Sequence, residues 1–216
     1  MQLPFTVDQF FDVFRAYNES VWPAQIFLAA LAVTALILAF IPRCWSSVVV
    51  SLILSFLWMW SAIAYHVLYF SRINPLAWLF AAISIVGSLG IAWHGVVRRA
   101  LRYAWDGGVR AGAGLLLVLF ALVIYPIWSS LGGHCYPAAP TFGLPCPTTI
   151  FTIGMMALLV RPHPRMPLIV PVVWSGIGAQ AAIFLGIPQD SFLGIAGLAG
   201  LALLATAGLR RKTRAA

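Results

Sequence analysis

Charged residues are scarce in this chain of 216 residues. Only 8% of the sequence is Asp, Glu, Lys or Arg, while 62% is hydrophobic. A soluble domain of this length needs more charge to cover its surface, so the composition excludes an ordinary soluble protein. The sequence also contains a single lysine, Lys212, in the C-terminal tail. No residue inside the apolar segments can therefore form the Schiff base of a retinal protein.

Cysteine is rare as well, and the motifs of several enzyme classes are missing. The 3 cysteines lack the paired Cys-x-x-Cys or His-x-x-x-His spacing of a strong metal site, so we predict no metal and no cofactor. No Gly-rich phosphate loop or acyl-transfer triad order is visible, which favours a protein that is not an enzyme. The net charge of +8 comes from arginines beside long apolar runs. That arrangement suits membrane topology and anionic lipid headgroups, and it excludes nucleic acid as a partner.

Long apolar segments follow one another along residues 22–209, each close to the roughly 20 residues that cross about 30 Å of hydrocarbon. We therefore predict an all-α, polytopic membrane helix bundle of seven transmembrane spans. The expected spans are residues 22–41, 47–70, 74–95, 111–128, 148–160, 168–186 and 191–209. The fifth is too short unless it reaches back to Phe142, which would place Pro145 and Pro147 inside it. We expect a broken helix there, with the Pro-Cys-Pro stretch buried in the mouth of the bundle.

The basic residues alternate between the two sides of these spans. Eleven of the 13 Lys and Arg residues follow the first, third, fifth or seventh span. They are Arg43, Arg98, Arg99, Arg102, Arg110, Arg161, Arg165, Arg210, Arg211, Lys212 and Arg214. Because cationic loops stay in the cytoplasm during insertion, the N-terminus is predicted outside and the basic tail 210–216 inside. The spacing of Phe10, Phe11 and Phe14 predicts an outer amphipathic segment at residues 1–21, capped by Thr6. The spacing of residues within 98–108 predicts a short inner helix there.

Polar residues capable of chemistry gather on the predicted outer side. The candidate binding residues are His66, Asn74, His134, Cys146 and Asp190. His66 is the most informative, because an ionisable group at membrane depth is costly unless it is paired or functional. It is either a ligand or proton carrier, or a neutral histidine bonded to a neighbouring helix. Asp190 is either the N-cap of the seventh span or a cation-attracting group at the outer mouth.

Two of the cysteines, Cys135 and Cys146, are also predicted on the outer side. There they could form a structural disulfide that holds the short Pro-rich loop between them. Cys146 alternatively begins the fifth helix, where the positive end of the helix dipole favours a reactive thiolate. His134, next to Cys135, leaves a His/Cys metal site as a weaker alternative.

Several motifs resemble a bacterial membrane family catalogued as domain of unknown function 6064. The motifs are Pro4-Phe5-Thr6, Tyr17-Asn18, Trp22-Pro23-Ala24-Gln25, Ile73-Asn74-Pro75, Pro140-Thr141-Phe142-Gly143, Pro145-Cys146-Pro147-Thr148-Thr149-Ile150-Phe151-Thr152 and Pro188-Gln189-Asp190. The resemblance extends over essentially the whole chain and implies a multi-pass protein of the bacterial inner (cell) membrane. It implies no activity and transfers no catalytic or binding residue.

Three functional hypotheses remain open from the sequence. The first is a membrane protein, in the manner of a transporter, that binds or passes a small solute or ion at an outward-facing polar mouth. The second is a membrane-embedded thiol-redox enzyme that uses Cys135 and Cys146. The third is an accessory subunit without a site, whose Gly- and Ala-rich last two spans contact a partner membrane protein or another copy of the chain.

Overall fold

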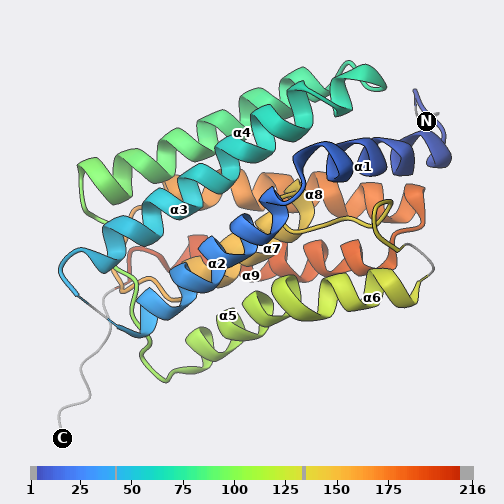
Figure 1. Ribbon diagram of the computed structural model, residues 1–216. Helices are drawn as coiled ribbons and strands as arrows, with labels where there is room; N and C mark the ends of the chain where they lie inside the picture. Colours follow the sequence, from blue (N-terminus) through green and yellow to red (C-terminus); the bar gives the residue numbers. More distant parts are fainter. Residues whose placement is uncertain (1–3, 42, 133–134, 210–216) are drawn as a thin grey trace, which may run out of the picture.

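The computed structural model describes residues 4–41, 43–132 and 135–209, and Figure 1 shows them as a bundle of helices, as predicted. The basic tail 210–216 and His134 lie outside the described residues. One end of the bundle contains α1 (Val7–Val21), and we call it the α1 end. The opposite end carries the loops with most of the described arginines, and we call it the arginine-rich end.

The remaining elements run between these two ends. They are α2 (Ala24–Phe40), α3 (Ser46–Trp60), the π-helical η1 (Ser61–Val67), the 3-10 turn η2 (Phe70–Arg72), α4 (Ala77–Ala92), the π-helical η3 (Trp93–Val97), α5 (Val109–Leu119), the π-helical η4 (Phe120–Ile124), α6 (Tyr125–Leu131), α7 (Pro145–Met156), α8 (Met166–Leu185), the 3-10 turn η5 (Pro188–Ser191) and α9 (Phe192–Thr206).

Four continuous helical stretches are long and apolar enough to cross a membrane. They are Ser46–Arg72, Ala77–Val97, Val109–Leu131 and Pro188–Thr206, and they correspond to the second, third, fourth and seventh predicted spans. Helices α1 and α2, which meet at an angle of 85°, provide a fifth if the bent pair is counted as one span. The structure therefore contains four or five candidate spans, and seven crossings stay a prediction.

Helix α1 forms where the sequence predicts an amphipathic helix. Thr6 caps it: its hydroxyl accepts from the Gln9 amide at 3.2 Å, and the Gln9 side chain accepts from the Thr6 amide at 2.9 Å. The apolar stripe does not face lipid as an interfacial helix would. Phe14 instead packs on Tyr65 and Phe10 on Phe70, with ring centroids 5.9 Å apart in both pairs.

Helix α7 lies in the middle of the bundle, where α3, α5, α8 and α9 pack around it (Figure 1). All its residues are buried except the half-buried Cys146. Its 12 residues rise about 18 Å, well short of the roughly 30 Å hydrocarbon layer. As predicted, the Pro-Cys-Pro stretch is buried within the bundle.

The expectation of a broken fifth helix was wrong. Pro145 is the first residue of α7 and Pro147 is the third. The first-turn amides of a helix have no partner within the helix, so prolines there remove nothing that the helix uses. They mark the start of a short helix, and Phe142 to Leu144 enter it as a non-helical strap.

Glycines allow α7 and its neighbours to approach closely. A Cβ on Gly114 of α5 would lie 2.6 Å from both the Ala157 Cβ and the Gly154 carbonyl oxygen. In α9, a Cβ on Gly200 would lie 2.5 Å from a methyl group of Val172, and one on Gly197 would lie 3.0 Å from the Ser175 Cβ. These contacts confirm that the last span uses small residues for close helix packing.

Residues 98–108 do not form the predicted inner helix. The segment is extended, and its amides pair with other parts of the chain: Ala104 donates to the Leu158 carbonyl at 3.1 Å and Trp105 to the Ala39 carbonyl at 3.2 Å. Leu101 and Tyr103 are buried, with 1% and 2% of their surface exposed. Burying these two side chains at the end of the bundle stabilises the extended conformation more than the spacing of the arginines favours a helix.

The glycine contact between α5 and α7 gives the first prediction. Gly114→Ala is expected to lower the free energy of unfolding by about 1–3 kcal/mol, because the new methyl group overlaps backbone and Cβ atoms. Gly112→Ala, on the same helix with nothing within 4 Å of the new Cβ, should be neutral or stabilising by up to about 1 kcal/mol. Thermal unfolding in detergent, followed by tryptophan fluorescence, measures both. Equal shifts for the two variants would contradict the close crossing.

Candidate functional site

A buried carboxylate lies at the α1 end of the bundle. Asp190, in η5, has 4% of its surface exposed, and the hydroxyl of the buried Tyr125 donates a hydrogen bond to it. The Cys146 thiol lies close to the same carboxylate. We call Tyr125, Cys146 and Asp190 the acidic cluster. Three separate segments, α6, α7 and η5, therefore meet at one charged group.

Asp190 is not the N-cap of the last span. That position belongs to Ser191, whose side chain makes no capping hydrogen bond. The 3-10 turn of η5 instead directs Asp190 into the bundle. The alternative interpretation, a cation-attracting group, stays a prediction.

His66 lies in a pocket of aromatic rings beside this cluster. Only 1% of its surface is exposed, and neither ring nitrogen has a hydrogen-bond partner. Its ring centroid is 5.0 Å from that of Trp174 and 5.9 Å from that of Phe80. The indole nitrogen of Trp174 is also buried without a partner. A histidine bonded to a neighbouring helix, the ordinary alternative, is not what the structure contains.

Helix α8 connects His66 to the acidic cluster. Trp174, which contacts His66, lies one helical turn from Gly178, and a Cβ on Gly178 would be 3.8 Å from the Cys146 sulfur. Tyr65 is within electrostatic range of both Cys146 and Asp190. The two groups of polar residues thus form one belt across the α1 end.

Two of the π-helical stretches, η1 and η4, adjoin this belt. Tyr65 and His66 belong to η1, and Tyr125 follows η4 directly. Such widened turns are rare and concentrate at functional sites, where they redirect side chains that a regular helix would place elsewhere.

The other predicted binding residues have different positions. Asn74 is buried, but its side-chain oxygen accepts from the Leu76 amide at 3.0 Å, which fixes the turn before α4. Cys135 is exposed, and both it and Cys146 are free thiols, so the proposed disulfide stays a prediction. His134 lies outside the described residues. Within the described residues, no group of three or more His, Cys, Asp or Glu side chains could hold a metal ion.

Asn18 fixes the loop that leads into α7, a role that we did not predict from the sequence. It is fully buried on α1, and its amide nitrogen donates to the carbonyls of Pro137 at 2.6 Å and Ala139 at 2.8 Å. Its side-chain oxygen accepts from the Thr141 hydroxyl at 2.6 Å. Gln25 donates to the Asn18 carbonyl at 2.9 Å. Several of the family-like motifs therefore meet at one hydrogen-bonded junction.

Gly143 continues this junction. Its φ is +102°, and a Cβ there would lie 2.4 Å from a methyl carbon of Leu28. Its carbonyl accepts from the Ser61 hydroxyl at 3.0 Å. Only glycine fits this position without strain, which explains the glycine that ends the Pro-Thr-Phe-Gly motif.

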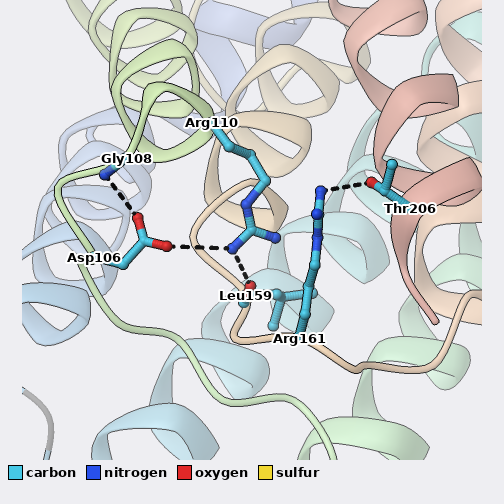
Figure 2. Close-up of polar contacts among 6 residues, drawn as sticks. All are labelled: Asp106, Gly108, Arg110, Leu159, Arg161 and Thr206. Carbon is cyan, nitrogen blue, oxygen red and sulfur yellow. Dashed lines mark hydrogen bonds and ion pairs between the residues drawn. The ribbon is translucent and has the colours of Figure 1, made fainter. Parts of the chain in front are cut away.

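At the arginine-rich end, two arginines hold the segment that leaves α7 (Figure 2). Arg110 donates to the Leu159 carbonyl at 2.6 Å and forms an ion pair with Asp106 at 3.9 Å. Arg161 donates to the Thr206 hydroxyl of α9 at 2.6 Å. The pKa of the nearby His163 is lowered by burial and by the charges of Arg110 and Arg161, against an opposing hydrogen bond to the Pro164 carbonyl.

The Asn18 junction predicts a large stability effect. Asn18→Ala removes the amide group that donates to the Pro137 and Ala139 carbonyls and accepts from the Thr141 hydroxyl. Loss of these three hydrogen bonds should lower the free energy of unfolding by about 3 kcal/mol. The neighbouring, exposed Glu19→Gln should change it by less than about 0.5 kcal/mol. Thermal unfolding of both variants in detergent tests this, and an Asn18→Ala protein as stable as the wild type would contradict it.

His163 predicts a pH dependence. A lowered pKa means that the folded state binds fewer protons here than the unfolded state, so protonation favours unfolding. The stabilising contribution is complete above the ordinary histidine pKa of about 6.5 and decreases as the pH falls below it. Between about pH 7.5 and 5.5, the unfolding temperature of the wild type should therefore fall more than that of His163→Gln. Arg165→Gln, which keeps His163, is the control, and parallel curves for wild type and His163→Gln would refute the effect.

Comparison with known proteins gives one family and no nearer relative. No curated protein and no solved structure matches the chain. The model of a family of unknown function, DUF6064, matches residues 7–215. Since this match spans nearly all of the sequence, the chain belongs to the DUF6064 family.

Proposed function

We propose that this protein is a multi-pass membrane protein that binds a small cation at the α1 end, with Asp190 as the charged ligand. The observation that carries the proposal is the burial of Asp190 without a basic partner. Among residues 4–41, 43–132 and 135–209, no Lys or Arg forms an ion pair with it.

A buried carboxylate without a counter-charge costs several kcal/mol in a low-dielectric interior. Tyr125 offsets part of this cost by donating a hydrogen bond, and the Cys146 thiol lies close to the carboxylate. A carboxylate has about four lone-pair positions, so acceptor capacity is left for a further ligand. A cation would supply the missing charge, and this favours a cation over an anion or a neutral solute.

His66 supports the same proposal as a second polar group. Both of its ring nitrogens and the indole nitrogen of the neighbouring Trp174 are buried without a hydrogen-bond partner. Buried polar atoms in proteins nearly always have a partner. A group of them around one histidine indicates a place where a water molecule or a solute completes the hydrogen bonds.

The surface of the bundle supports insertion in a bilayer. Large apolar side chains are exposed on helices from every part of the chain: Phe27 is 57% exposed, Trp78 60%, Leu89 57% and Leu198 70%. Such a continuous apolar surface is incompatible with water. We further propose the finer topology: seven crossings that include α2, α8 and the stretch 142–160 that contains α7, with the N-terminus outside in the bacterial inner membrane.

Neutralising Asp190 tests the proposed function. The probes are Na⁺, K⁺ and methylammonium chloride, each compared with the bulky N-methylglucamine chloride at equal ionic strength. At least one probe should raise the unfolding temperature of the purified wild type saturably, because a ligand that binds only the folded state stabilises it. Asp190→Asn keeps an acceptor for Tyr125 but removes the charge, and it should abolish this increase.

Asp12→Asn is the matched control, since Asp12 is an exposed carboxylate on α1 at the same end of the bundle. It should retain the full response. His66→Gln should weaken the response without abolishing it. A wild type that no probe stabilises, or an Asp190→Asn protein that responds like the wild type, would overturn the proposal.

A further inference from the structure

A cavity of about 360 Å³ opens at the arginine-rich end, far along the bundle from Asp190. Its wall includes the first turn of α3 at Ser47, the preceding loop at Arg43, and the extended segment that carries Arg99 and Arg102. A volume of this size lies within the range of small-ligand sites. It is large enough for one phosphorylated headgroup and too small for a whole lipid.

The charge of this cavity is positive and uncompensated. Three arginines line it, Arg43, Arg99 and Arg102, while none of the chain's 5 acidic residues does. Within the described residues none of the three forms an ion pair. The carboxylate nearest in sequence, Asp106, pairs with Arg110 instead. The walls therefore present several guanidinium donors to whatever enters.

The backbone around the cavity adds to the same polarity. Helix α3 begins at the cavity wall, so the positive end of its dipole lies there and attracts anions. Ser47 is held in the wall, because its hydroxyl accepts from the Tyr103 amide at 3.0 Å. This contact fixes the arginine-bearing segment against α3.

Arg99 has an unusual backbone conformation at this site. Its φ is +48°, and within the described residues it is the one residue other than glycine with a positive φ. Two hydrogen bonds enforce the turn: Arg98 donates to the Trp93 carbonyl at 2.9 Å and Ala100 to the His94 carbonyl at 2.8 Å. The left-handed backbone conformation is strained for an arginine. The turn brings Arg99 and Arg102 into the wall of one cavity, and such strain is concentrated at binding sites.

The position of the cavity along the bundle fits the headgroup level of a membrane. Trp45, Trp93 and Trp105 surround this end and are 52%, 50% and 39% exposed. Exposed tryptophans mark the interface between hydrocarbon and headgroups. Phosphate is the anionic group found at that depth, and the planar guanidinium pairs with phosphate oxygens in a bidentate manner.

We infer that this arginine cavity binds a phosphate group, carried either by an anionic lipid headgroup or by a soluble phosphate ester. The site is separate from the acidic cluster and does not depend on the function proposed for it. In this proposal Arg99 and Arg102 donate hydrogen bonds to the phosphate oxygens, and Arg43 contributes a third positive charge to the cavity wall. The first turn of α3 adds the positive end of its helix dipole.

Two probes distinguish the sources of the phosphate. Purified protein in detergent is titrated with dioctanoyl phosphatidylglycerol, with binding counted by native mass spectrometry, and with inorganic phosphate, with binding followed by thermal unfolding. Binding of the lipid alone identifies a headgroup site, and binding of both probes identifies a site for phosphate esters in general. Either outcome supports the inference, whereas a wild type that binds neither probe overturns it.

The double variant R99Q/R102Q should weaken binding by roughly tenfold or more, because two charge-assisted hydrogen-bonding partners are lost. The matched control R98Q/R165Q removes the same charge from the same end, at exposed positions outside the cavity wall. It should weaken binding by less than about twofold. Equal losses in the two variants would show attraction to general surface charge and refute the site. If R99Q/R102Q does not fold, Arg43→Gln makes the same test from the opposite wall.

Discussion

Helix α7 is too short to cross a bilayer, so the chain on both sides of it must find its hydrogen-bond partners inside the protein. In hydrocarbon, each unpaired amide or carbonyl costs several kcal/mol. At one end, Asn18 and Ser61 satisfy the carbonyls of Pro137, Ala139 and Gly143 in the segment before α7. At the other end, Arg110 and the extended segment 98–108 satisfy those that follow it. Much of the irregular structure at both ends serves this requirement.

The same requirement gives the two ends of the bundle opposite chemistry. The α1 end closes around an acidic group with neutral donors, whereas the arginine-rich end closes around guanidinium groups that partly serve as backbone donors. Arg110 and Arg161 are used structurally, while Arg43, Arg99 and Arg102 are left along a cavity. From the sequence, the arginines indicate only the topology. The fold separates two further groups among them: arginines that donate hydrogen bonds within the protein and arginines that line a cavity.

Features with a local cause could be predicted from the sequence. The capping box at Thr6 and Gln9, the apolar lengths of four spans and the close helix contacts of Gly197 and Gly200 all depend on neighbouring residues or on composition. His66 was identified because an ionisable residue at membrane depth is conspicuous in an apolar segment, and Asp190 because an acidic residue stands directly before the last span. Both are buried at the predicted end of the bundle.

Features that depend on tertiary partners were missed. From the sequence, Tyr125 is one of several aromatic residues near the ends of spans. Its hydrogen bond to Asp190 exists only in the folded arrangement. Asn18 reads as the polar face of an amphipathic helix, although its partners lie more than a hundred residues away. Residues 98–108 have weak helical spacing, and their extended form follows from the carbonyls of α2 and of the segment after α7, which no local pattern reveals. Pro145 and Pro147, which were predicted to break a span, instead lie in the first turn of a short helix.

The central placement of α7 also determines which parts of the molecule are able to move. The segment before the helix is held by Ser61 at one end, and the segment after it by Arg110 and α9 at the other; Gly154, in the last turn of the helix, contacts the backbone of Gly114 in α5. Sliding or tilting it would break all three sets of contacts together, so it behaves as a fixed axis. Any rearrangement that admits a molecule to Asp190 must therefore come from the peripheral elements, and η5, joined to α8 by the left-handed Gly186, is the segment with the least chain to displace.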